Sequence, residues 1–159
     1  RFRPLGETDS EHAFCVLMDA IAAAHARTRK GPSLNAIVET IRPVVDRLAE
    51  FGEFNFVLGN GESLIVHAHT KLHALHRSCR IEGCQRDVVL LATSPLTNEP
   101  WSPLAPRSMH VYANGRESFV TSRAHARIGQ GRVRSQEVSA IQMGKFDEEL
   151  RRSIKLGSR

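Results

Sequence analysis

The sequence predicts an α+β domain in which two helices are followed by antiparallel strands. Three observations support this: apolar residues recur at helical spacing in the first third of the chain, the period then changes to two, and two Asn-Gly pairs separate alternating apolar runs. The 159 residues are 41% hydrophobic and 25% charged, as in an ordinary globular domain. A chain of this size buries roughly 70% of its unfolded surface, so its core requires neither metal nor disulfides.

Two helices are expected before residue 52. Asp9 or Ser10 is predicted to cap the first, and Ser33 the second. Pro43 is expected to kink or divide the second helix, and Gly52 to end it. The expected buried faces are Phe14, Leu17, Met18 and Ile21 in the first helix and Leu34, Ile37, Val38, Ile41, Val45 and Leu48 in the second.

The remaining elements are predicted as strands, with the helices packed on one face of their sheet. Residues 54–58 and 63–70 flank Asn60-Gly61 and indicate a β-hairpin. A second Asn-Gly pair, at 114–115, indicates another. The other expected strands are residues 71–77, 88–93, 109–113 and 119–121.

The net charge of +5 is unevenly distributed. Residues 1–115 contain 12 basic and 12 acidic side chains, whereas residues 116–159 contain 10 and 5. The boundaries predicted from this pattern are a core over 1–120 and a basic C-terminal extension over 121–159. This extension lacks the interleaved aromatic residues that stack on single-stranded bases, and it matches no helix-turn-helix or zinc-finger pattern, so nucleic-acid binding is the weakest hypothesis for it.

No membrane span or secretory signal is expected. The longest apolar stretch, residues 14–24, is interrupted by Asp19 and is shorter than the roughly 20 residues that a spanning helix needs. The chain starts at Arg1 without a signal-peptide pattern, and we expect it to be a fragment of a longer protein.

Three cysteines, Cys15, Cys79 and Cys84, are an odd number without a CxxC spacing, which favours reduced thiols in a cytoplasmic protein. Basic neighbours could activate Cys79 or Cys84, but no base or oxyanion site lies nearby in the sequence. We therefore expect these two to be free thiols in a loop.

Four histidines form the most conspicuous cluster: His67, His69, His73 and His76. Imidazoles at i and i+2 of a strand share a face and could offer two metal ligands. No carboxylate or thiol joins them at a known ligand spacing, so we expect no metal site. Instead, His67 and His69 are expected on the polar face of an alternating strand.

The segment 2–11 combines Gly, Thr, Asp and Ser in a loop that enters a helix. Such a loop presents a carboxylate and hydroxyls beside unsatisfied N–H groups, as a recognition loop for a small zwitterion would. A plain helix cap is the alternative. The two Asn-Gly pairs could supply oxyanion donors, but their position between apolar runs favours hairpin turns.

This segment, Phe-Arg-Pro-Leu-Gly-Glu-Thr-Asp-Ser-Glu, resembles the FRPxGETDSE stretch of class II, N-terminal-nucleophile (Ntn) glutamine amidotransferases, in the YafJ-like branch. Residues 54–62, 70–77 and 92–101 resemble later elements of that family in the same order. The resemblance therefore covers roughly residues 1–120 and rests on several separate motifs.

The resemblance implies a partial Ntn-hydrolase-type αββα sandwich and an amidohydrolase that releases ammonia from glutamine or a related γ-glutamyl amide through an N-terminal cysteine. Asp9 would bind the α-ammonium of the substrate, with support from Thr8. No cofactor or metal is implied. The partners left open are a synthase that accepts the ammonia or a second copy of the chain.

The family's nucleophilic cysteine, its substrate-binding arginine and its oxyanion Asn-Gly belong to a half that would precede this segment. Cys15 does not replace the nucleophile, because it lies on a predicted helix without a free α-amine. Asn60-Gly61 does not replace the oxyanion pair, because it follows the Asp9 loop. We therefore expect no catalytic residue in this chain and no activity from it alone. The alternative hypothesis is a non-catalytic binding or assembly module derived from the same fold.

Overall fold

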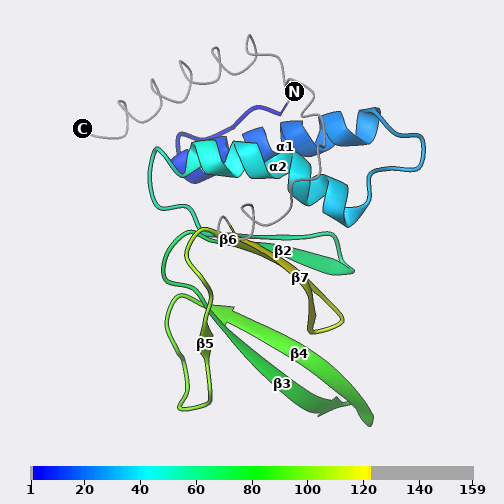
Figure 1. Ribbon diagram of the computed structural model, residues 1–159, viewed down its shortest axis with the longest axis vertical. Helices are drawn as coiled ribbons and strands as arrows, with labels where there is room; N and C mark the ends of the chain where they lie inside the picture. Colours follow the sequence, from blue (N-terminus) through cyan, green and yellow to red (C-terminus); the bar gives the residue numbers. More distant parts are fainter. Residues whose placement is uncertain (1, 123–159) are drawn as a thin grey trace. The chain divides into compact units, whose positions relative to one another are not determined.

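A computed structural model describes residues 2–122 of the protein (Figure 1). The described residues form two compact units, one ending at Leu48 and the other starting at Ala49. Helices α1 (Asp9–Ala26) and α2 (Leu34–Leu48) form the first unit, and antiparallel strands form the second. The α+β class is confirmed. The predicted boundary at residue 120, the basic extension and the packing of the helices on a sheet remain predictions.

Helix α1 begins one residue earlier than its predicted caps allow. The N-cap is Thr8, in the extended conformation, and its Oγ1 accepts the backbone N–H of Glu11 at 3.3 Å. Asp9 and Ser10 are already helical, so the cap prediction was wrong. The predicted buried face was also partly wrong, because Phe14 is 50% exposed. The buried residues are Ala13, Leu17 and Ala24, two of which are too small to stand out in an apolar pattern.

Helix α2 contacts α1 and follows its prediction more closely. Ser33 Oγ accepts the N–H of Ala36 at 3.3 Å, which confirms the cap. Pro43 lies inside the helix without dividing it. Both Pro43 and Glu39, whose carbonyl loses its helical hydrogen bond there, are exposed, so water can satisfy that carbonyl. The buried residues are Val38, Ile41, Val45 and Leu48.

In the described part of the second unit, seven strands form two antiparallel sheets. The four-stranded sheet has the order β1-β2-β6-β7, and the three-stranded sheet has the order β4-β3-β5. The bounds are β1 (Phe56–Gly59), β2 (Ser63–Ala68), β3 (His73–Ile81), β4 (Cys84–Ala92), β5 (Ser102–Pro103), β6 (Ser108–Ala113) and β7 (Arg116–Ser122).

Both predicted Asn-Gly turns are present. At the β1–β2 turn, Asn60 Oδ1 accepts the N–H groups of the two residues that follow Gly61, at 3.0 and 2.8 Å, and Gly61 has φ +92°. At the β6–β7 turn, Asn114 and Gly115 have φ 51° and 72°. Positive φ at both central positions is typical of a type I′ hairpin turn.

A third hairpin was not predicted. Glu82 and Gly83, with φ 50° and 78°, connect β3 to β4. Cys79 and Cys84 therefore lie on paired strands, and their predicted place in a loop was wrong. The residue types did not indicate this hairpin, because Glu, unlike Asn or Asp, has no preference for the left-handed conformation of such a turn. All three cysteines are free thiols.

An apolar cluster in the second unit contains side chains of both sheets. Its buried members are Val66, Ala68, Leu72 and Tyr112, and the partly buried Leu64, Val89, Leu91 and Leu104 pack against them. The Tyr112 hydroxyl has no hydrogen-bond partner among the described residues. Burial, and secondarily the neighbouring Glu117 carboxylate, raises the pKa of Tyr112 well above its usual value.

The β6–β7 turn closely approaches the backbone of β4. A Cβ added to Gly115 would overlap the Asp87 carbonyl and come within 2.7 Å of the Val88 nitrogen. Beside this approach, Arg116 Nε donates to Asp87 Oδ2 at 2.6 Å. This ion pair, with a hydrogen bond from Ser78, lowers the pKa of Asp87. Glycine is therefore required at position 115 for two reasons: the backbone is left-handed there, and the Asp87 backbone leaves no room for a Cβ.

We expect Gly115→Ala to destabilise the protein by at least about 2 kcal/mol more than Gly61→Ala. Both glycines have positive φ in Asn-Gly turns, so each substitution incurs the left-handed cost of about 1–2 kcal/mol. An added Cβ meets nothing within 4 Å at Gly61, which makes it the matched control. Urea denaturation measures both variants, and equal free energies of unfolding would contradict the prediction.

We expect Tyr112, the single tyrosine of the chain, to ionise well above pH 10.0 in the folded protein. Because its folded pKa is raised, the associated stability is present below the unfolded value of 10.0 and is lost as the pH rises further. Ultraviolet absorbance of the tyrosinate measures the titration. Urea-unfolded protein should titrate at the ordinary value, and Tyr112→Phe should remove this alkaline stability loss; equal folded and unfolded titrations would refute the prediction.

Candidate functional site

The loop that enters α1 is held by carboxylates of the helix itself. The Glu11 carboxylate accepts two consecutive backbone N–H groups: that of Leu5 at Oε1, 2.6 Å, and that of Gly6 at Oε2, 2.8 Å. Farther along the helix, Asp19 Oδ1 accepts the N–H of Phe2 at 2.7 Å. The loop backbone is thus tied to the helix at two points.

The predicted site residues, Thr8 and Asp9, lie together where this loop becomes helix. Thr8 uses its hydroxyl oxygen for the cap, whereas Asp9 is the first helical residue and its side chain is exposed. Asp9 Oδ1 accepts the Ser10 N–H at 2.7 Å and lies 3.4 Å from the Ser10 hydroxyl. The partial positive charge of a helix N-terminus stabilises a carboxylate here. The arrangement offers an oriented, accessible anion suited to a cationic group.

Glu7, Ser10 and Glu11 match the family motif, but the motif assigns them no role beyond shaping the loop and the helix cap, and the structure adds a specific contact for Glu11. Thr8 and Glu11 have the T-x-x-E spacing of a capping box, a signal that could have identified the interaction. In that motif the glutamate returns to the N–H of the cap residue. Here it reaches farther back, to Leu5 and Gly6.

His67 and His69 are buried, with 3% and 8% exposure, so their predicted place on a polar face was wrong. Both hydrogen bond to the backbone of one residue on the segment before β1. His67 Nδ1 lies 2.7 Å from the Phe54 carbonyl oxygen, and the Phe54 N–H donates to His69 Nδ1 at 3.1 Å. These bonds explain how two imidazoles occupy buried positions, His67 within β2 and His69 directly after it. Across residues 2–122, no group of three or more His, Cys, Asp or Glu side chains is arranged to hold a metal ion.

A Ser–His–Glu chain also lies in the second unit. His110 Nε2 lies 2.6 Å from Ser108 Oγ, and His110 Nδ1 lies 2.6 Å from Glu117 Oε1. This is the order of a hydrolytic triad. However, Ser108 is 0% exposed, and its hydroxyl also donates to the Ala105 carbonyl. These three side chains therefore form an internal hydrogen-bond network that fixes the start of β6.

The segment after β4 is ordered by a surface ion pair. Arg77 Nε donates to Glu99 Oε1 at 2.7 Å, and Thr97 Oγ1 donates to Glu99 Oε2 at the same distance. Trp101 Nε1 donates in turn to Thr97 Oγ1 at 3.1 Å. The bonds from Arg77 and then Thr97 lower the pKa of Glu99. These contacts explain why an exposed segment that resembles the family keeps a defined path.

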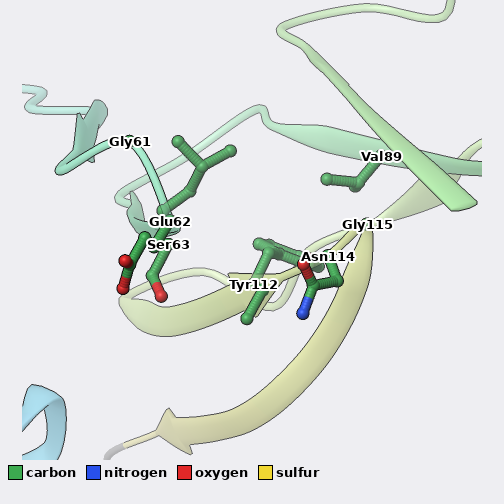
Figure 2. Close-up of a pocket in the computed structure, with 9 residues that line it drawn as sticks. Gly61, Glu62, Ser63, Val89, Tyr112, Asn114 and Gly115 are labelled. Carbon is green, nitrogen blue, oxygen red and sulfur yellow. The ribbon is translucent and has the colours of Figure 1, made fainter.

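A shallow cavity of about 220 Å³ lies between the two Asn-Gly turns (Figure 2). Figure 2 shows Gly61, Glu62 and Ser63 on one side and Tyr112 and Asn114 on the other. Its volume is below the roughly 300 Å³ at which small-molecule sites begin. It therefore ranks behind the Asp9 loop as a candidate site.

Comparison with known proteins identifies the family. A family model described as "Glutamine amidotransferases class-II" matches residues 1–82, just over half of the chain. "Putative glutamine amidotransferase" of Haemophilus influenzae is 34% identical over 71% of this chain and 44% of its own length. "Putative glutamine amidotransferase YafJ" of Escherichia coli is 31% identical over 72% of this chain and 51% of its own length.

A solved structure shares the fold. The crystal structure of a "predicted glutamine amidotransferase" from Pseudomonas aeruginosa matches with a TM-score of 0.65 and 26% identity, over 75% of this chain and 53% of that one. The chain thus spans about half the length of the relatives it matches. In residues 2–122 no helix is long and apolar enough to cross a membrane. The matched residues include the whole Asp9 loop, and the chain belongs to the class-II glutamine amidotransferases.

Proposed function

We infer that this chain supplies the substrate-orienting part of an enzyme that hydrolyses the side-chain amide of glutamine, or of a related γ-glutamyl compound, to the acid and ammonia. The observation that carries this is the exposed Asp9 carboxylate, held at the start of α1 inside the segment that matches the family. In this proposal Asp9 binds the α-ammonium of the substrate. A charge-assisted contact there fixes the orientation of the amide and discriminates against compounds without the amine.

The proposal places the nucleophile outside these 159 residues. Following the family resemblance, an N-terminal cysteine uses its own α-amine as the base, and the thiolate attacks the amide carbonyl. The C–N bond breaks, ammonia leaves with the transferred proton, and a γ-glutamyl thioester remains. Water then cleaves the thioester and restores the thiol. Free glutamine and a γ-glutamyl peptide both present the α-amine that Asp9 would bind.

We expect Asp9→Asn to lower kcat/KM for glutamine about 10–100-fold in the complete amidotransferase domain, because the charged partner of the α-ammonium is lost. Hydrolysis of 4-carbamoylbutanoate, which is glutamine without its α-amine, should be unchanged. Glu7→Gln is the matched control, since it neutralises another exposed carboxylate of the same loop. If Asp9→Asn affected both substrates equally, or neither, the assigned role of Asp9 would be wrong.

We expect the purified 159-residue chain to release no ammonia from glutamine above the buffer rate. The reason is that the proposed nucleophile and oxyanion donors lie outside it. A coupled ammonia assay measures this, with the complete domain as the positive control. Turnover by the chain alone would show that its own residues perform the chemistry, and would overturn the division proposed above.

A further inference from the structure

We propose that Glu11 is a positioning residue for substrate binding: its carboxylate sets the path of the loop that presents Asp9. This inference rests on the proposed role of Asp9. The geometry is a two-oxygen clamp, in which one carboxylate accepts the N–H groups of Leu5 at 2.6 Å and of Gly6 at 2.8 Å. Hydrogen bonds to an ionised acceptor are about twice as strong as neutral ones, and these lie at the short end of their range.

The clamp acts on the loop more than on the helix. A capping-box glutamate would satisfy the N–H of the cap residue, Thr8. Glu11 instead bonds two residues that precede the cap, whose N–H groups are outside the helix. Its own N–H is bound by Thr8 Oγ1 at 3.3 Å. The hydrogen bonds from the Leu5 and Gly6 N–H groups to the Glu11 side chain therefore close a loop over residues 7–10, the stretch that contains Asp9.

Apolar burial does not determine this loop conformation. The Leu5 side chain is 100% exposed, Phe2 is 47% exposed, and Gly6 has no side chain. Hydrophobic packing usually fixes the path of a segment, and here it contributes little. Polar contacts must do so, and over residues 5–8 the structure gives the backbone N–H of Leu5 and Gly6 one shared acceptor, Glu11.

Gly6 is matched to the clamp. A Cβ at this position would lie 2.6 Å from Glu11 Oε2, closer than any real contact. Because that oxygen ends a flexible side chain, the chain would tolerate the methyl group by displacing the carboxylate. The displacement would break the hydrogen bond to the Gly6 N–H. Gly6→Ala and Glu11→Gln should therefore release the loop in the same way.

The carboxylate of Asp9 is oriented through its own backbone. Asp9 Oδ1 accepts the adjacent Ser10 N–H at 2.7 Å, so its direction follows the local chain. Without the Glu11 hydrogen bonds the loop would adopt other conformations. Asp9 would then move relative to the bound substrate without losing its charge. The expected consequence is weaker binding of the α-ammonium, with the bond-breaking step itself unchanged.

The test is a kinetic and exchange comparison in the complete amidotransferase domain. Glu11→Gln replaces one acceptor oxygen with an NH₂ group that opposes a backbone N–H. We expect KM for glutamine to rise about tenfold with kcat nearly constant. Hydrolysis of 4-carbamoylbutanoate should not change. Glu7→Gln is the charge-matched control on the same loop, and Gly6→Ala is a second variant that keeps the Glu11 carboxylate.

Two further measurements separate positioning from general stability. Hydrogen exchange at the Leu5 and Gly6 amides should accelerate in Glu11→Gln and stay slow in Asp9→Asn. In the double variant with Asp9→Asn, the Glu11→Gln effect on KM should disappear, because the two residues act through one contact.

The outcomes distinguish the two proposals. Additive effects in the double variant, or equal losses for glutamine and the analogue, would overturn the positioning role of Glu11. Unchanged exchange at the Leu5 and Gly6 amides would overturn the clamp itself. If Asp9→Asn alone has no effect on kcat/KM for glutamine while Glu11→Gln accelerates exchange, the clamp exists but the proposed function of Asp9 fails.

Discussion

The packing of two antiparallel sheets through one apolar cluster is the constraint on which the second unit depends. Val66 and Tyr112 come from the four-stranded sheet, and Val89 and Leu91 from the three-stranded sheet. Each fully buried side chain of this size contributes about 1.5–3 kcal/mol. The contact forces the β6–β7 turn against β4, where only glycine fits at position 115.

The same constraint explains the buried polar groups. β2 and β6 pair at the centre of the sheet, and their successive residues are buried on both faces. Polar side chains at such positions must find hydrogen bonds, and those of β2 and β6 largely do so: His67 with the Phe54 carbonyl, and His110 with Ser108 and Glu117. His69, which directly follows β2, accepts the Phe54 N–H. In a sequence, residues of these types suggest a catalytic or metal site. Here their hydrogen bonds instead compensate for the burial of polar groups. The Asp9 loop differs, since it is exposed and is organised by a carboxylate instead of by a core.

Local signals predicted much of the fold. The Asn60-Gly61 and Asn114-Gly115 turns were predicted correctly because the turn preference belongs to the dipeptide itself: glycine adopts positive φ at both sites, and asparagine either adopts it too, at Asn114, or accepts turn N–H groups with its side chain, at Asn60. The Glu82-Gly83 turn and β5 were missed, because Glu82 has no intrinsic preference for positive φ and β5 is two residues long. Phe14 was wrongly placed in a buried face because burial depends on what packs against a helix. At the candidate site, Thr8 and Asp9 were identified by the family motif. The backbone groups that Glu11 binds could not be identified in this way, because they depend on how the loop folds back onto the helix.

The sequence alone determined the types of the two helices and of the longer strands, two of the hairpin turns, the family and the loop that carries Asp9, because each of these depends on neighbouring residues or on a short motif. The tertiary structure decided which side chains are buried, why Gly115 is irreplaceable, and which backbone groups Glu11 binds. Those properties depend on residues far apart in the chain or on a loop that returns to its own helix. Periodicity and spacing report the direction of a side chain from its own element, but the partner it meets is fixed only when the elements pack.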